Sequence, residues 1–263
     1  MNNNFNFKKS LGQNFLHDKN IIHKIVESAN VDKNTLVIEI GPGSGALTLE
    51  LVPKSKHTIL YEADNRLEIY LRDLLQKYNN YTLFLGDFLD ADVNKDIKNI
   101  FYDKIYVVAN LPYYITTPII MKFIDDDILP DKMVIMVQKE VASRLAANIG
   151  SRDYGSFTVL LNYYYDINKL FDVSRNCFIP KPNVDSAVLS MKLKKKRLKV
   201  NNISLFKKLV RDSFSMKRKT LRNNLKNYDL DVIERILLKY GLTLSDRAEK
   251  VSLEAFIDIC NNL

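Results

Sequence analysis

EIGPGSG, residues Glu39–Gly45, indicates the fold class of this chain more directly than any other segment. It follows the apolar run 36–38 and precedes the segment Leu47–Leu51. A glycine-rich turn between a buried strand and a helix lets the backbone approach a nucleoside-type cofactor. Its spacing is G-x-G-x-G, whereas the dinucleotide fingerprint has its third glycine one position later. The stretch therefore predicts a Rossmann-like domain, and its spacing argues against a nicotinamide oxidoreductase.

Further apolar, β-branched runs follow this turn at intervals that leave room for helices. Such runs, separated by amphipathic segments, are typical of a parallel sheet covered on both faces. The expected strands are 36–40, 58–61, 83–85, 105–109 and 134–137, with 163–167 and 187–193 as an antiparallel pair at the edge. The fold class is therefore α/β, with a mostly parallel seven-stranded sheet.

A composition break at 192–199 separates this pattern from a helical one. Apolar residues recur at helical spacing at 205–210, 221–225 and 233–240, and Ser252 is placed to cap a last helix. We predict a catalytic domain over 1–195 and a small all-helical domain over 196–263.

The net charge of +8 is unevenly distributed. From Lys192 to Lys226 there are 14 lysines and arginines against one acid, Asp212, so this segment carries +13 and the other residues carry −5. A basic segment attached to a mildly acidic domain is typical of a polyanion binder. The alternative is a solvated linker and helix face.

Two acids end expected strands after the glycine turn. Glu62 ends the second strand, where a carboxylate can accept both ribose hydroxyls of an adenosine, and Asp87 follows the third, where it can orient an adenine amine. Ligands of open α/β sheets bind at these carboxyl ends. Each acid taken alone is often only a helix cap.

NLPY, residues Asn110–Tyr113, ends the fourth expected strand. The Asn110 side-chain oxygen and the Leu111 carbonyl can accept the two hydrogens of an exocyclic amine, while Pro112 fixes the backbone. The ring of Tyr113 offers a face on which a flipped-out base can stack. Together with the glycine turn, the motif predicts methyl transfer from S-adenosylmethionine to an amino nitrogen on a nucleobase. Alone it would be an ordinary strand-to-turn transition.

Phe178 is a second candidate for base stacking, because the prolines of Cys177–Asp185 (CFIPKPNVD) stiffen its loop. The alternative is a ring that anchors this loop to the core.

Metal and membrane signals are weak in this sequence. Cys177 and Cys260 have no paired-ligand spacing, and the three histidines form no cluster, so we expect no metal site and a reducing, cytoplasmic setting. No apolar run approaches the length of a membrane span. We expect a monomer.

Several long motifs give the chain a resemblance to the KsgA-type small-subunit ribosomal RNA adenine dimethyltransferases, almost from end to end. The motifs are Lys9–Leu16, Glu39–Gly45, Asn110–Tyr113 with Thr116–Pro118, Val137–Ala142, Asp153–Ser156, Phe178–Val188 and Arg218–Leu225. The resemblance implies a class I S-adenosylmethionine-dependent methyltransferase fold. It also implies N6,N6-dimethylation of two adjacent adenosines in a hairpin loop near the 3′ end of 16S rRNA, during maturation of the 30S subunit precursor.

The resemblance also implies roles for residues of this chain. The cofactor residues would be Asn14, Leu16, Gly41, Gly43, Glu62, Asp87 and Asn110. The target-base residues would be Asn110, Leu111, Pro112, Tyr113 and Phe178. In the basic segment, Lys217, Arg218, Lys219 and Arg222 are the expected RNA-binding residues. Tyr114 directly follows the motif and is a second bulky ring, and the sequence does not decide its effect on the pocket.

Two rival functions remain at this point. The large-subunit (23S) rRNA adenine methyltransferases of the antibiotic-resistance type share the glycine turn and an Asn-x-Pro-Tyr motif, although Thr117-Pro118 and Arg218–Leu225 favour the small-subunit group. A non-catalytic ribosome-assembly or transcription factor is the other rival, and the intact cofactor and amine-binding motifs argue against it.

Overall fold

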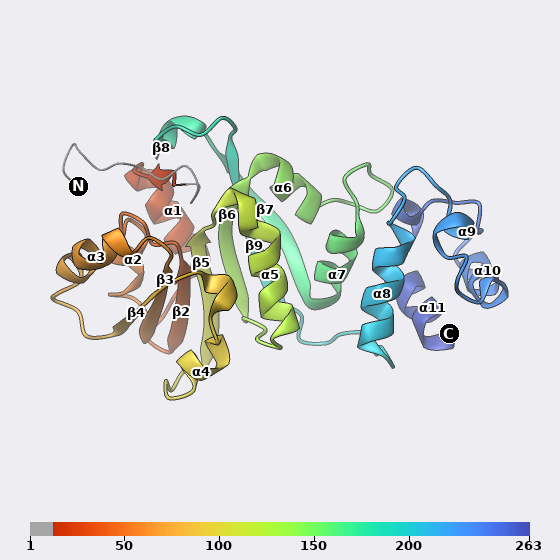
Figure 1. Ribbon diagram of the computed structural model, residues 1–263, viewed down its shortest axis with the longest axis horizontal. Helices are drawn as coiled ribbons and strands as arrows, with labels where there is room; N and C mark the ends of the chain where they lie inside the picture. Colours follow the sequence, from red (N-terminus) through yellow and green to blue (C-terminus); the bar gives the residue numbers. More distant parts are fainter. Residues whose placement is uncertain (1–12) are drawn as a thin grey trace. The chain divides into compact units, whose positions relative to one another are not determined.

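The computed structural model describes residues 13–263 and divides the chain into two compact units (Figure 1). The first unit takes in the chain up to Ala142 together with Asn168–Leu193. The second takes in Ser143–Ile167 and Lys194–Leu263. Among the described helices, none has both the length and the apolar character needed to cross a bilayer.

A seven-stranded sheet with the order β4-β3-β2-β5-β6-β9-β7 forms the core of the first unit. The first five strands in this order, from β4 to β6, run parallel to one another. Strand β9 runs antiparallel to β6, and β7 lies at the edge. The strands are β2 (Thr35–Ile40), β3 (His57–Glu62), β4 (Tyr81–Leu85), β5 (Lys104–Asn110), β6 (Lys132–Gln138), β7 (Tyr165–Val173) and β9 (Ser186–Leu193). The predicted mostly parallel, seven-stranded α/β sheet is therefore confirmed.

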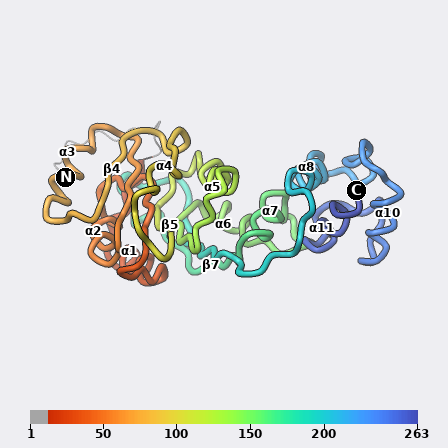
Figure 2. The backbone as a smooth tube through the Cα atoms, turned by 90° about the horizontal axis from the view of Figure 1, so that it is seen from below, coloured from red at the N-terminus to blue at the C-terminus, as the bar shows by residue number. Residues whose placement is uncertain are grey.

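Helices cover both faces of this sheet (Figure 2). Helix α1 (Lys19–Ala29) packs Ile22, Ile25 and Val26 onto one face, and α5 (Thr116–Asp125) packs Phe123 onto the other. Because both faces are covered, every residue of β2 is buried, which explains its apolar run at 36–38. The remaining helices of this part are α2 (Thr48–Leu51), α3 (Glu68–Leu74), α4 (Val93–Ile97) and α6 (Lys139–Leu145), which runs on into the second unit.

A short two-stranded ribbon joins β1 (Phe15–Leu16) to β8 (Phe178–Ile179) in the first unit. The strands are antiparallel, and Leu16 lies opposite Phe178. The ribbon links segments about 160 residues apart in the chain, and the sequence pattern did not predict it. The part of the Lys9–Leu16 motif before Gln13 lies outside the described residues.

The second unit is helical. Its helices are α7 (Ser156–Tyr164), α8 (Ile203–Ser213), α9 (Leu221–Asn224), α10 (Leu230–Lys239) and α11 (Leu253–Asn262). Their apolar faces share one core, to which Phe206, Leu237 and Phe256 contribute fully buried side chains. Ser252 caps α11 as predicted, since its hydroxyl accepts the Ala255 N–H at 3.1 Å.

The division of the chain differs from the predicted one at residues 143–167. The sequence pattern predicts that they belong to the catalytic domain, whereas the structure groups them with the C-terminal helices. The reason is that α7 packs Val159 and Leu160 into the core of the second unit. The strand expected over 163–167 accordingly begins only at Tyr165, because Tyr163 and Tyr164 complete α7.

Candidate active site

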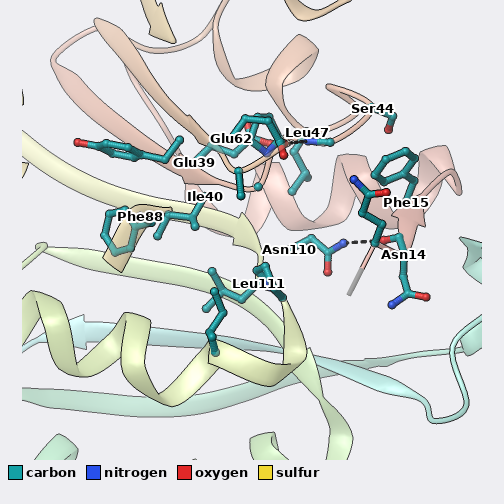
Figure 3. Close-up of a pocket in the computed structure, with 18 of the residues that line it drawn as sticks. Asn14, Phe15, Glu39, Ile40, Ser44, Leu47, Glu62, Phe88, Asn110 and Leu111 are labelled. Carbon is teal, nitrogen blue, oxygen red and sulfur yellow. Dashed lines mark hydrogen bonds between the residues drawn. The ribbon is translucent and has the colours of Figure 1, made fainter. Parts of the chain in front are cut away.

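A cavity opens at the carboxyl ends of β2, β3, β4 and β5 (Figure 3). It encloses about 920 Å³ including its open mouth. Ligands of open α/β sheets bind at this edge. The predicted site residues that line it are Asn14, Leu16, Gly41, Gly43, Glu62, Asp87, Asn110, Leu111, Pro112 and Tyr113.

The glycine turn after β2 forms one wall of the cavity. Gly41 and Gly43 have φ values of +69° and +56°, in a backbone region that residues other than glycine rarely adopt. A Cβ atom on Gly43 would lie 2.9 Å from Cε1 of Phe15, so the turn also leaves room for that ring. Gly45 has a packing role instead, because a Cβ there would collide with Leu74 of α3.

Glu62 lies at the base of the cavity at the end of β3, with only 5% of its surface exposed. Its Oε2 accepts the Gly43 N–H at 3.0 Å and its Oε1 accepts the Asp64 N–H at 2.8 Å. Burial raises the pKa of this carboxyl above its ordinary value. Each carboxylate oxygen can accept a second hydrogen bond, so Glu62 can hold the glycine turn and still accept donors from a ligand.

Glu39 is a second buried acid of the cavity that the site prediction did not include. It is 1% exposed, and the Thr48 hydroxyl donates to its Oε2 at 2.7 Å. Burial raises its pKa to about 8, and the hydrogen bond from Thr48 lowers it again in part. The signal in the sequence was an acid inside an apolar strand, which is rare without a functional or structural reason.

The end of the cavity formed by β4 is partly apolar. Phe88 packs its ring against Tyr61 and Phe123, at centroid distances of 5.1 and 5.2 Å. Asp87 is exposed beside it, and its Oδ1 caps a short 3₁₀ turn by accepting the Leu89 N–H at 2.9 Å. Asp87 is thus a helix cap, the alternative to a cofactor-binding role that the sequence leaves open, and it also lines the cavity.

The segment Gln13–Leu16 borders the other side of the cavity. Gln13 donates its Nε2 hydrogen to Oδ2 of Asp64 at 2.7 Å. The backbone oxygen of Asn14 accepts a hydrogen bond from Nδ2 of Asn110 at 3.2 Å. The segment is therefore fastened to the ends of two different strands of the sheet.

Asn110, the last residue of β5, has an oriented amide group. Its Nδ2 points at the Asn14 carbonyl, and Figure 3 shows the amide oxygen turned away from that contact. The next residue is also fixed, since the Leu111 N–H donates to the Met136 carbonyl at 3.1 Å. Because the Asn14 carbonyl binds Nδ2 of Asn110, the Oδ1 atom of Asn110 is left to accept a hydrogen bond from another group.

Tyr113 follows on a 3₁₀ turn, η4 (Tyr113–Ile115). Its hydroxyl lies 2.6 Å from the hydroxyl of Ser186, the first residue of β9. Burial raises the pKa of Tyr113, so the phenol is neutral at physiological pH. Its neighbour Tyr114 is 55% exposed and also lines the cavity.

Phe178 is placed differently from its prediction. It is 2% exposed, pairs with Leu16 in the β1–β8 ribbon, and packs into the core with Ile22 and Val188. It is not among the residues that line the cavity of the described chain. Phe178 therefore anchors its loop to the core, which is the alternative given above to a base-stacking role.

The sequence as a whole matches one protein-family model. Residues 4–263 match the model described as ribosomal RNA adenine dimethylase. The chain belongs to this family.

Individual relatives agree with this family. "Ribosomal RNA small subunit methyltransferase A" of Anoxybacillus flavithermus is 44% identical, over 98% of this chain and 91% of its own length. The protein of the same name from Geobacillus is 45% identical, over 98% of this chain and 92% of its own length. The one from Staphylococcus aureus is 44% identical, over 96% of this chain and 88% of its own length. None of these relatives carries the name of a large-subunit enzyme.

Solved structures give the same fold. A dimethyladenosine transferase from Plasmodium falciparum is similar with a TM-score of 0.76 at 27% identity, covering 93% of this chain and 95% of its own. The 23S rRNA methyltransferase ErmE is similar with a TM-score of 0.74 at 25% identity, covering 95% and 99%. The fold is therefore of class I methyltransferase type. One of the two neighbours is a 23S rRNA enzyme by its title, so the fold alone does not decide which RNA is modified.

The predicted RNA-binding residues of this family member lie in the second unit. Lys217, Arg218, Lys219 and Arg222 are all exposed, on and beside the segment between α8 and α9. Other cations of the basic segment have partners within the unit. Lys194 donates to the Asn162 carbonyl at 2.6 Å, and the Arg197 guanidinium lies over the Tyr164 ring at 5.4 Å. Some of the positive charges of the segment Lys192–Lys226 thus bind groups within the protein itself.

Proposed function

We propose that this chain transfers methyl groups from S-adenosylmethionine to N6 of two adjacent adenosines in a hairpin loop near the 3′ end of 16S rRNA. The product is N6,N6-dimethyladenosine, and the substrate is a precursor of the 30S subunit in the cytoplasm, to which the enzyme binds as a monomer. The observation that carries the proposal is the oriented amide of Asn110 in a cavity that the glycine turn and Glu62 also line.

The cavity suits S-adenosylmethionine along its length. Glu62 has the lone pairs to accept the ribose hydroxyls, and Phe88 gives an apolar wall for the adenine. Asp87 is exposed at the same end, where its carboxylate can accept a hydrogen bond from the adenine amine. The Asn14 and Asn110 end of the cavity would hold the part of the cofactor that carries the sulfonium. The cofactor would supply a methyl group activated by the positive sulfur, which leaves as a neutral thioether when its bond to the methyl breaks.

The target amine needs orientation rather than deprotonation. The lone pair on N6 of adenine is delocalised into the ring, so this nitrogen is a poor nucleophile. Acceptors at Oδ1 of Asn110 and at the Leu111 carbonyl favour a pyramidal nitrogen whose lone pair points at the methyl group. Tyr113 supplies the stacking face for the flipped base. The methylated nitrogen would carry an extra proton, which is acidic enough to pass to solvent. Positioning and electrostatics then do most of the work, and no strong base is required.

The test is methylation of 30S particles from a strain that lacks this activity, followed by nucleoside mass spectrometry and site mapping. We expect two adjacent dimethylated adenosines near the 3′ end of 16S rRNA. Modification of 23S rRNA instead would identify the large-subunit activity. Binding to the particle without any methyl transfer would identify a non-catalytic assembly factor.

A further inference from the structure

The segment between α8 and α9 carries three consecutive cations, Lys217, Arg218 and Lys219, and all three are exposed. Adjacent like charges repel one another, and an exposed segment without internal support would sample many conformations. Such a segment would have to be ordered each time it bound a polyanion, at a cost in affinity. The structure shows what holds it.

A single side chain, that of Asn224, bonds to the backbone at both ends of the turn that leads into these cations. Its Nδ2 donates to the Ser213 carbonyl at 2.6 Å and to the Met216 carbonyl at 3.3 Å. Its Oδ1 accepts the Met216 N–H at 3.2 Å and the Ser215 hydroxyl at 3.3 Å. One amide thus donates to and accepts from a single four-residue turn.

The helix that carries Asn224 is itself fixed. At the start of α9 the Leu221 N–H donates to the Asp246 carbonyl at 2.8 Å and the Arg222 N–H donates to the Leu244 carbonyl at 3.0 Å. Leu221 and Leu225 are buried in the core of the second unit. The Asn224 amide is therefore attached to a packed element, and the turn is attached to the amide.

We propose that Asn224 is a positioning residue for RNA binding. It holds Ser213–Met216 in one conformation, so that Lys217, Arg218 and Lys219 are presented together to a phosphate backbone. The proposal rests on the RNA-binding role of these cations stated above. Asn224 makes no contact with RNA in this account. It lowers the cost of ordering the segment, which is the general advantage of a preorganised binding loop.

The decisive measurement compares Asn224→Ala with Asn227→Ala, an exposed asparagine three residues further along. Affinity for 30S particles and methylation kinetics are measured for both. We expect Asn224→Ala to weaken binding by about three- to thirtyfold and to raise KM, with kcat and S-adenosylmethionine affinity unchanged. Asn227→Ala should bind as wild type does. Circular dichroism checks that both variants are folded.

A second pair serves if the alanine variant is poorly folded. Asn224→Asp keeps the size and the accepting oxygen but loses both donors. Asn227→Asp adds the same charge at a nearby exposed position. We expect the first to bind more weakly than the second. Equal affinity in both matched pairs would overturn the proposal.

The same substitution is then made in a background without the cations, Lys217→Gln/Arg218→Gln/Lys219→Gln. If Asn224 acts through these cations, Asn224→Ala should change binding by less than twofold there. A loss as large as in the wild type would mean general destabilisation and would sink the proposal. If the triple variant itself binds as wild type does, the RNA-binding role of the cations fails and the positioning role fails with it. If the triple variant loses affinity while Asn224→Ala does not, only the positioning role is lost.

Discussion

Asn110 has two roles that a pair of substitutions can separate: an acceptor for the target amine and an amide held in one orientation. Asn110→Ala removes both, and we expect no detectable turnover while RNA binding persists. Asn110→Asp keeps an accepting oxygen but turns a carboxylate oxygen toward the Asn14 carbonyl, which now accepts from Nδ2 at 3.2 Å. Repulsion between the two oxygens should rotate the carboxylate, so Asn110→Asp should also lose most activity. Single-turnover assays with nucleoside mass spectrometry test both; wild-type dimethylation by either variant excludes the assigned role.

The second methyl transfer should be more fragile than the first. A free adenine amine gives one hydrogen to Asn110 and one to the Leu111 carbonyl, and after one transfer only one hydrogen remains. Mild changes such as Leu111→Val or Tyr114→Phe should therefore raise the share of monomethyladenosine. Time-resolved mass spectrometry measures that share. Equal slowing of both steps, without accumulation of the monomethyl product, contradicts this account.

The hydroxyl pair of Tyr113 and Ser186 should fix the ring that stacks on the base. Ser186 is fully buried, so either Tyr113→Phe or Ser186→Ala leaves one polar group without its partner and should cost about 1–3 kcal/mol of unfolding free energy. The double variant removes both groups and should cost less than the sum of the two single changes. Denaturant unfolding of the four proteins gives the coupling. Additive costs would show that the hydroxyls do not interact.

Some secondary-structure elements can be located from the sequence pattern, and others cannot. The central parallel strands are predictable because burial on both faces gives them runs of apolar residues, as at 36–38 in β2. The β1–β8 ribbon was not, because two-residue strands give no periodicity and their pairing joins distant segments. The predicted acid and amide positions all line the cavity, since they end strands that end together. The hydrogen bond from Asn110 to Asn14, and the burial of Phe178, depend on the ribbon and were therefore not predictable.

Contact between the glycine turn and the β1 segment gives a prediction about cofactor binding. In Gly43→Ala the new Cβ would lie 2.9 Å from the Phe15 ring, at a φ of +56°. The β1 segment should move, and S-adenosylmethionine affinity should fall at least tenfold. Gly150→Ala is the matched control, because it has a φ of +80° and nothing within 4 Å of its Cβ. Both should lose about 1–2 kcal/mol of stability from backbone strain, but only Gly43→Ala should bind the cofactor weakly in calorimetry. Unchanged affinity would show that the turn tolerates the displaced ring.

Stability of the folded chain should depend on pH through the buried acid Glu39. Its pKa is raised to about 8 in the fold, whereas an exposed glutamate titrates near 4.5. Between these values the folded state binds a proton that the unfolded state has released, so stability falls as pH rises from about 4.5 to about 8. The slope can reach about 1.4 kcal/mol per pH unit. Glu39→Gln should flatten it in thermal unfolding experiments, and an unchanged slope would mean that Glu39 is ionised in the fold.

Charge is divided across the whole molecule in a way that should separate RNA binding from cofactor binding. The segment Lys192–Lys226 carries +13 and the remaining residues carry −5, so a polyanion is attracted mainly to one part of the chain. Each phosphate that a protein neutralises releases counterions and steepens the salt dependence of binding. Reversing Lys217, Arg218 and Lys219 to glutamate should therefore weaken 30S binding strongly and flatten its salt dependence. These residues lie outside the cavity lining, so S-adenosylmethionine affinity should stay at the wild-type value. Titrations at several salt concentrations measure both effects. A triple variant with the wild-type affinity and salt slope would show that these cations are a solvated surface, and the RNA contact would then have to lie elsewhere on the chain.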